Sequence, residues 1–228
     1  MPLQIPNVLS GPQVSEFRRT LAESTWIDGT ATAGHLSRTA KHNRQLPETQ
    51  PLAIDLGNRI LDVLERHPLF MSYALPAKIV PPLFNAYRCG EHYGRHIDGA
   101  VRPIAGHSVR IRSDLSATLF LSDPQDYDGG ELVIEDAEGG EPRVYKLAAG
   151  TLLLYSSGSV HYVAPVTRGE RLASFFWIQS MVRSSAHRVA LFDLDRIIQT
   201  LHTRVPGDAC LVDLTGHYHN LLRLWADI

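Results

Sequence analysis

The chain of 228 residues is long enough to bury one sizeable core, so we expect one main domain with a small appendage. Hydrophobic residues make up 44% of it and charged residues 20%, a balance that excludes disordered and fibrous proteins. The formal net charge of -2 lacks the basic excess that nucleic-acid binding usually needs, so we expect no nucleic-acid partner.

Two helices are predicted at the start of the chain. Ser10 is a candidate N-cap for a first helix, in which apolar residues recur at helical spacing as far as Leu21. A similar pattern from Leu56 to Leu64 predicts a second helix that ends before Pro68. Both helices come before the predicted core.

The stretch between these helices, residues 30–47, shows no sustained period and is predicted to be a loop. We interpret its histidines, His35 and His42, as solvated side chains and not as ligands. The N-terminus lacks a signal-peptide pattern, and no segment approaches the ~18 uninterrupted apolar residues of a membrane span. We therefore expect a cytoplasmic protein without a membrane partner.

From residue 70 to residue 178 the pattern changes to short β-rich runs separated by turn residues. This spacing is typical of a β-sandwich or barrel, and glycine-containing turns lie between several of the runs. The runs are 79–80, 83–87, 118–121, 132–134, 144–147, 152–155, 160–164 and 172–178. The sequence predicts a jelly roll (double-stranded β-helix) core.

Helical periodicity returns after Arg183 and continues to the end of the chain, apart from a break at Pro206 and Gly207. The predicted fold is therefore mainly β with flanking helices, of the α+β class. We expect a core domain over residues 1–182, with its jelly roll beginning near residue 70, and a helical C-terminal appendage over residues 183–228.

Three residues have the types and spacing of a metal site. His96 and Asp98 are two positions apart, so on an extended backbone both side chains project from one face. His161 begins a later strand-like run and supplies a second imidazole. Two histidines and one carboxylate leave three adjacent metal positions open, as non-haem iron(II) oxygenases require, whereas zinc is more often tetrahedral.

Arg171 lies ten residues beyond His161, at the start of an apolar run. A strand, a tight turn and a returning strand would direct both side chains into one interior. A buried guanidinium needs a partner, and a dicarboxylate ligand would match its planar fork. The alternative is a structural arginine paired with Glu170 or Glu131.

With these residues the chain resembles the 2-oxoglutarate and iron(II)-dependent oxygenases of the prolyl 4-hydroxylase-like branch, and most closely the bacterial PKHD-type hydroxylases. The resemblance extends over nearly the whole chain. The motifs that carry it are YRCG at 87–90, YGRHID at 93–98, LFLS at 119–122, DGGEL at 128–132 and HYVAPVTRGER at 161–171.

The resemblance implies that His96, Asp98 and His161 bind Fe(2+) as the catalytic centre, and that Arg171 binds the distal carboxylate of 2-oxoglutarate. It implies oxidative decarboxylation of 2-oxoglutarate to succinate and CO2 with dioxygen, coupled to hydroxylation of a substrate. It also suggests L-ascorbate as accessory reductant and a link to iron starvation.

Two further residues are candidates for contact with 2-oxoglutarate. Tyr87 lies nine residues before His96, where relatives have a tyrosine that lines the co-substrate site. Some prolyl hydroxylases have another such tyrosine where Phe120 stands here, and Phe120 cannot donate a hydrogen bond. Thr118, on the same strand face, is a substitute.

Several other residues are interpreted as ordinary polar residues. We do not expect His92, His107, His217 or His219 to be metal ligands. Cys89 and Cys210 are too few for a disulfide framework. Two other functions remain open, a cupin-type metalloprotein and a regulatory metal sensor without turnover.

The sequence does not identify the substrate, a small molecule or a protein side chain, and has no signal for oligomeric state. Arginines are concentrated between residues 88 and 112, and the connection after Asp98, residues 99–110, shows no clear strand or helix period. We predict that the whole stretch 88–112 forms a mobile cationic rim over the iron and selects an anionic substrate. Its arginines are Arg88, Arg95, Arg102, Arg110 and Arg112.

Overall fold

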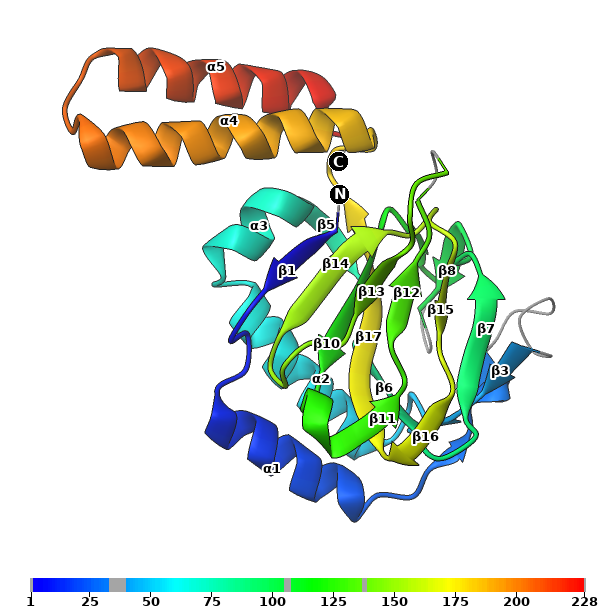
Figure 1. Cartoon of the computed structure of the whole chain (residues 1–228). Helices are drawn as coiled ribbons and strands as arrows, with labels where there is room; N and C mark the ends of the chain where they lie inside the picture. The colour runs from blue at the N-terminus through cyan, green and yellow to red at the C-terminus, as the bar shows by residue number, and fades with distance from the viewer. Residues whose placement is uncertain (1, 33–39, 105–107, 137–138, 228) are drawn as a thin grey trace.

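The computed structural model describes residues 2–32, 40–104, 108–136 and 139–227 of the chain (Figure 1). The helices in these residues are α1 (Gly11–Ala22), α2 (Pro51–Leu64), α3 (Pro68–Ala74), α4 (Ser185–Arg204) and α5 (Cys210–Trp225), with short 3₁₀ turns η1 (Gly29–Thr32) and η3 (Pro124–Asp126). None of the described helices has both the length and the hydropathy to cross a membrane.

The larger antiparallel sheet runs in the order β1-β14-β10-β17-β6-β4-β2, and β5 also pairs with β17. Its long central strand is β17, which pairs with β10 on one side and with β6 on the other. The strands are β1 (Leu3–Ile5), β14 (Leu152–Ser156), β10 (Leu115–Phe120), β17 (Arg171–Ser180), β6 (Leu83–Tyr87), β4 (Arg44–Gln45), β2 (Ile27–Asp28) and β5 (Pro76–Ile79).

The smaller antiparallel sheet runs in the order β13-β12-β15-β7-β3. Its strands are β13 (Arg143–Tyr145), β12 (Leu132–Ile134), β15 (His161–Val163), β7 (His92–His96) and β3 (Lys41–His42). Two further strand pairs are β11 (Tyr127–Gly129) with β16 (Val166–Gly169), and β8 (Val101–Pro103) with β9 (Arg110–Arg112).

The hydrophobic core has two principal layers, one on each face of the larger sheet. On the outer face, α1, α2 and α3 pack against alternate residues of β6, β10, β14 and β17, among them Leu119, Leu154 and Phe176. On the inner face, Phe120 and Leu153 pack against Leu132 and other residues of the smaller sheet. The two sheets therefore face each other across a shared interior, and helices cover the outside of the larger one (Figure 1).

The two-residue alternation of β17 explains how one strand serves both layers. Leu172, Phe176 and Ile178 belong to the helix-facing core, while Arg171 contacts the inner rings of Tyr87 and Phe120. The strand is buried along most of its length because both of its faces are covered.

The C-terminal helices α4 and α5 form a hairpin that extends away from the sheets (Figure 1). Near its base the Tyr73 ring of α3 meets Phe192 of α4 edge-on, with ring centres 5.2 Å apart. A β-bridge between Val182 and Ala226 joins the end of α5 to the segment that precedes α4. Leu75 and Val182 share a small apolar cluster with Leu191 of the hairpin, which attaches the hairpin to the rest of the chain.

The prediction of an α+β fold, mainly β with flanking helices, is confirmed. Several local predictions are wrong. Residues 30–47 are not simply a loop, because β3 and β4 lie there and add to both sheets. The helix α3 occupies the start of the predicted β region, and the connection of residues 99–110, which shows no clear period, contains β8 and the first residue of β9. His35 and His107 lie outside the described residues.

Candidate active site

Neighbouring strands of the smaller sheet bring the three predicted ligands together. His96 is the last residue of β7, and His161 is the first residue of β15, directly opposite it in the antiparallel register. Asp98 follows two residues after His96. One ligand atom from each side chain lies within 4.8 Å of the others, so the trio has the size of a metal site.

Backbone carbonyls hold both imidazoles in the same way. The Nδ1 atom of His96 lies 2.8 Å from the carbonyl oxygen of Gly94, and Nδ1 of His161 lies 3.0 Å from that of Ser159. A carbonyl can only accept, so each Nδ1 carries the proton and each Nε2 offers its lone pair to a metal. Burial lowers the pKa of His96, and His161 beside it lowers that pKa further, which favours the neutral ligand form.

Two serines orient the carboxylate. The Ser116 hydroxyl donates to Asp98 Oδ2 at 2.6 Å and lies 2.8 Å from the Ser157 hydroxyl. Both serines are buried. Oδ2 of Asp98 is also 3.7 Å from Nε2 of His161. Such outer hydrogen bonds fix the direction of a ligating carboxylate.

Aromatic rings pack around the histidines. Tyr93 stacks on His96 with ring centres 3.7 Å apart and an interplanar angle of 16°, and Tyr155 meets His161 edge-on at 5.1 Å. The rings leave each imidazole little freedom to rotate. Two imidazoles and one oriented carboxylate fit an iron(II) ion with open positions for further ligands.

Arg171 enters the interior as the first residue of β17, opposite Tyr87 of β6. The turn that leads into it needs Gly169, whose φ is +73° and whose absent Cβ would lie 2.1 Å from the carbonyl oxygen of Asp126. No L-residue with a side chain fits there without a shift of the backbone. This turn directs Arg171 inward and its neighbour Glu170 outward.

The surroundings of Arg171 are aromatic. Its side chain is 1% exposed, and its guanidinium lies 5.3 Å from the ring centres of both Tyr87 and Phe120. In the described part of the chain, no carboxylate lies within 4.0 Å of it, and its Nε has no hydrogen-bond partner. The suggested structural partners are engaged elsewhere: Glu170 pairs with Arg44 and Arg88, and Glu131 lies 3.8 Å from Lys146.

The remaining predicted co-substrate residues lie on the same inner face. Tyr87 is 1% exposed, and burial raises the pKa of Tyr87 to about 12, so its hydroxyl remains a donor at neutral pH. Thr118 is buried on β10, two residues from Phe120, and its hydrogen bond with Tyr155 opposes the rise that burial causes in the pKa of Tyr155. Tyr87 therefore lies beside Arg171, and Thr118 bonds to Tyr155, whose ring meets that of His161.

Sequence reasoning missed four residues of this interior: Ser116, Tyr155, Tyr127 and Lys41. Ser116 could have been found, because it precedes Thr118 by two positions and shares its strand face. Tyr127 is fully buried, and its hydroxyl has no hydrogen-bond partner within the described ranges. Lys41 carried no local signal, since its burial comes from pairing with β7.

The histidines that were not expected to bind metal lie apart from the trio where the structure describes them. The ring of His92 contacts that of His42 at a tilt of 42°, with ring centres 4.8 Å apart. His217 and His219 lie on α5, in the C-terminal hairpin. Cys89 and Cys210 are exposed free thiols.

The predicted rim of five arginines is wrong for three of them. Arg88, Arg95 and Arg112 form ion pairs with Glu170, Glu135 and Asp114, respectively, at distances of 2.6 to 2.8 Å. Their charges are neutralised, so they do not form a free cationic surface. Arg110 is exposed on β9, and Arg102 packs over the ring of Trp177.

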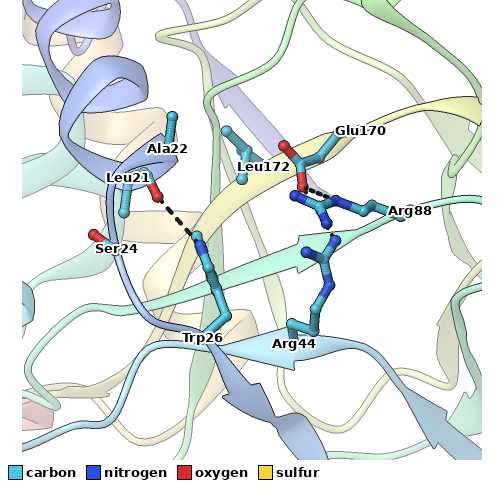
Figure 2. A pocket seen from close by; sticks show the side chains of 8 residues that line it. All are labelled: Leu21, Ala22, Ser24, Trp26, Arg44, Arg88, Glu170 and Leu172. Carbon is cyan, nitrogen blue, oxygen red and sulfur yellow. Dashed lines mark hydrogen bonds and ion pairs between the residues drawn. The ribbon is translucent and has the colours of Figure 1, made fainter.

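A cavity of about 370 Å³ lies between α1 and the larger sheet, and its lining includes none of the metal trio (Figure 2). Trp26, Leu172 and the ends of two arginines line it, and Glu170 is shared between these arginines. Its charges are paired within the protein. We therefore assign the cavity no part in catalysis.

Comparison with known proteins agrees with this geometry. Residues 82–179 match the 2OG-Fe(II) oxygenase superfamily, and residues 186–227 match the PKHD-type hydroxylase C-terminal domain. A PKHD-type hydroxylase of Burkholderia cenocepacia is 55% identical over 228 residues, 100% of both chains. One of Saccharophagus degradans is 53% identical over 226 residues, 99% of both chains.

Solved structures support the fold. A Pseudomonas putida prolyl-4-hydroxylase aligns with a TM-score of 0.53 and 22% identity, covering 78% of this chain and 92% of that one. A Trichoplax adhaerens prolyl hydroxylase aligns with a TM-score of 0.56 and 16% identity, covering 83% and 86%. The full-length relatives decide the family, and the chain belongs to the PKHD-type hydroxylases, enzymes that depend on iron(II) and 2-oxoglutarate.

Proposed function

We propose that His96, Asp98 and His161 bind the iron(II) ion and that Arg171 binds the distal carboxylate of 2-oxoglutarate. One observation carries the proposal. Two imidazoles and a carboxylate converge within 4.8 Å in the same interior as a guanidinium that is 1% exposed and has no carboxylate beside it among the described residues. A buried charge of this kind costs stability unless a ligand of opposite charge pairs with it.

Each side chain has a separate task in this proposal. Bound iron(II) supplies the activation of dioxygen that couples decarboxylation of 2-oxoglutarate to hydroxylation of a substrate C–H bond. Arg171 orients the co-substrate, and Tyr87 and Thr118 contact it through their hydroxyl groups. Ser116 orients Asp98, while the rings of Tyr93 and Tyr155 exclude water.

We also propose that the two facing sheets form a jelly roll and that the chain divides after residue 182. The antiparallel pairing of both sheets and the shared inner core support the jelly roll. The division is supported by the position of the α4–α5 hairpin outside the two sheets (Figure 1) and by the separate family match over residues 186–227. The core and the C-terminal appendage are then residues 1–182 and 183–228.

The wider setting is proposed from the family alone. L-Ascorbate would keep the iron reduced, the protein would act in the cytoplasm, and its hydroxylation would serve cells starved of iron. A comparison of succinate yield with and without ascorbate over many turnovers tests the first point. Loss of activity at the same rate in both samples would contradict it.

The central experiment measures succinate formed from 2-oxoglutarate by the iron-loaded protein, together with metal binding by calorimetry. His96→Ala, Asp98→Ala and His161→Ala should each abolish turnover and weaken metal binding. A regulatory metal sensor, the alternative function, would bind metal but form no succinate.

His92→Ala is the matched control, since His92 lies on the same strand as His96 but its ring contacts that of His42. It should retain both turnover and metal binding. Undiminished metal affinity in all three ligand variants would show that another site holds the iron.

A further inference from the structure

Lys41 is a buried cation close to the proposed iron ligands. It is 4% exposed, and its Nζ donates to Gln45 Oε1. In the register of β3 with β7, Lys41 lies opposite Tyr93, and its Nζ is 5.4 Å from the centre of the Tyr93 ring. Because that ring stacks on His96, a single aromatic side chain separates Lys41 from a proposed metal ligand.

Arg102 brings a second cation to the same region. Its guanidinium lies 3.4 Å from the centre of the Trp177 ring. Burial lowers the pKa of Arg102, and Asp98 acts in the opposite direction. The charge of Arg102 in turn lowers the pKa of Lys41. The two cations are therefore close enough to repel each other, and both lie within electrostatic range of Asp98.

The aromatic side chains beneath these cations belong to β17. Phe175 and Trp177 alternate with Phe176 along the strand, and their rings meet edge-on at 5.5 Å. Lys41 Nζ is 5.8 Å from the Phe175 ring centre. Trp177 is 5% exposed, and its Nε1 donor has no acceptor among the described residues. A buried N–H donor without an acceptor is unfavourable.

Register places this cluster beside the metal site and away from Arg171. Trp177 lies opposite Ser116, the serine that donates to Asp98. Arg171 lies six residues earlier on β17, or roughly 20 Å along an extended strand. This length separates the α-carbons, so the cluster and Arg171 lie at well-separated positions along the same strand.

We propose that Lys41, Arg102 and Trp177 form a binding site for a carboxylate group of the hydroxylated substrate. Phe175 and the face of Trp177 contact an apolar part of the same molecule. The two cations and the indole N–H then donate hydrogen bonds to the carboxylate oxygens of the substrate, beside the proposed iron site. The inference rests on the proposed function, because it names the substrate class of that iron site.

The test uses the full chain, loaded without oxygen with iron(II) and saturating 2-oxoglutarate. The probes are 3-phenylpropionate and its uncharged amide, titrated by calorimetry and by quenching of tryptophan fluorescence. The acid should bind at least tenfold more tightly than the amide. Lys41→Met and Arg102→Gln should each weaken binding of the acid about tenfold, with affinity for 2-oxoglutarate unchanged within twofold.

Arg110→Gln is the matched control, because Arg110 is exposed on the strand that pairs with that of Arg102, and it should bind both probes as the wild type does. Equal affinities for acid and amide, no binding of either, or undiminished binding in both variants would overturn the inference. Failure of the proposed function would appear separately, as loss of 2-oxoglutarate or metal binding in the wild-type protein before any probe is added.

Discussion

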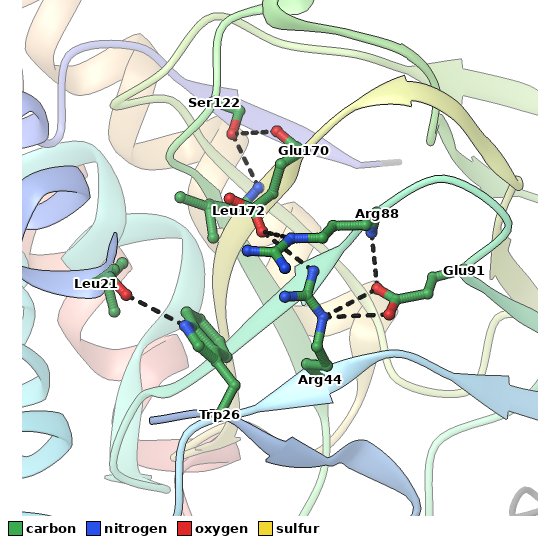
Figure 3. A network of polar contacts seen from close by, with 8 residues as sticks. All are labelled: Leu21, Trp26, Arg44, Arg88, Glu91, Ser122, Glu170 and Leu172. Atoms are coloured by element: carbon green, nitrogen blue, oxygen red, sulfur yellow. Dashed lines mark hydrogen bonds and ion pairs between the residues drawn. The ribbon is translucent and has the colours of Figure 1, made fainter. Parts of the chain in front are cut away.

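Two adjacent residues, Arg171 and Glu170, face opposite sides of the larger sheet and have opposite surroundings. Arg171 points into the interior, 1% exposed, between aromatic rings. Glu170 points outward and accepts from Arg44 at 3.1 Å and from Arg88 at 2.8 Å, and Glu91 completes the network (Figure 3). The outer charges are balanced within the protein, whereas the inner charge has no acid beside it in the described residues.

This difference between Glu170 and Arg171 distinguishes a charge that is paired within the protein from a charge that binds a ligand. Side chains of the outer network remain 20 to 63% exposed, so water shares the stabilisation and each pair contributes little. Inside, the guanidinium is 1% exposed and bears nearly the full cost of desolvation, so the free protein retains it at a cost in stability. Such a residue is explained by a ligand that completes the pair.

Replacement of Arg171 tests the inner side of this comparison and should give the largest effect. Arg171→Leu should reduce affinity for 2-oxoglutarate by about 100-fold or more, since loss of one partner from a buried charge pair costs about 3 kcal/mol or more. Arg171→Lys should be intermediate. Calorimetry on the metal-loaded protein measures the affinity. Thermal unfolding should show a free protein at least as stable as the wild type, and a large loss of stability would indicate a structural role.

Lys41 extends the comparison to a second buried cation. Burial lowers the pKa of Lys41 to about 8, so between pH 8 and 10.5 the unfolded chain binds a proton that the folded chain does not. Stability therefore rises with pH across this window. From pH 7.5 to 9.5 the wild type should gain about 2 kcal/mol relative to Lys41→Met. Urea unfolding of both proteins at both pH values measures the gain. An equal change in the free energy of unfolding of the wild type and Lys41→Met would refute the lowered pKa of Lys41.

Replacement of Ser116 tests whether hydrogen bonds on the inner side of the sheet determine metal affinity. Its hydroxyl is the donor to Asp98 Oδ2, so Ser116→Ala should weaken metal binding by about 10- to 100-fold. Ser122→Ala is a suitable control, because Ser122 is also buried but bonds only to the backbone at Glu170 and Leu172. Metal titration of both variants compares them, and equal affinities would remove Ser116 from the site.

Glu170→Gln tests the outer side and should give the smallest effect. The variant loses one charge from a partly exposed network, so the free energy of unfolding should fall by about 1 kcal/mol or less. Affinity for 2-oxoglutarate should change less than twofold, even though Glu170 is the neighbour of Arg171. A tenfold loss of affinity would show instead that the network positions Arg171.

The sequence predicted those features that depend on local pattern. The run 132–134 coincides with β12, and 152–155 lies within β14, because alternation on a covered strand is visible in a short window. The histidines, Asp98 and Arg171 were found through motif spacing, and the structure brings the metal trio together.

What the sequence could not predict depends on pairing between distant segments. The strands β3 and β4 have two residues each, too few to show any period, and they form because β7 and β6 offer free edges. The burial of Lys41 follows from that pairing. Likewise, the ion pairs of Arg88 and Arg95 join residues 40 or more positions apart, so arginine density alone counted as free two charges that are paired within the protein.

The backbone carbonyls behind His96 and His161 have a consequence for the tolerance of this site to mutation. Every residue has a carbonyl oxygen, so substitution of Gly94 or Ser159 cannot delete the acceptor that fixes either imidazole. The orientation of Asp98 depends instead on a side chain, Ser116, which one codon change can remove. Random mutagenesis should therefore leave imidazole geometry largely intact and recover loss-of-function variants at the serine.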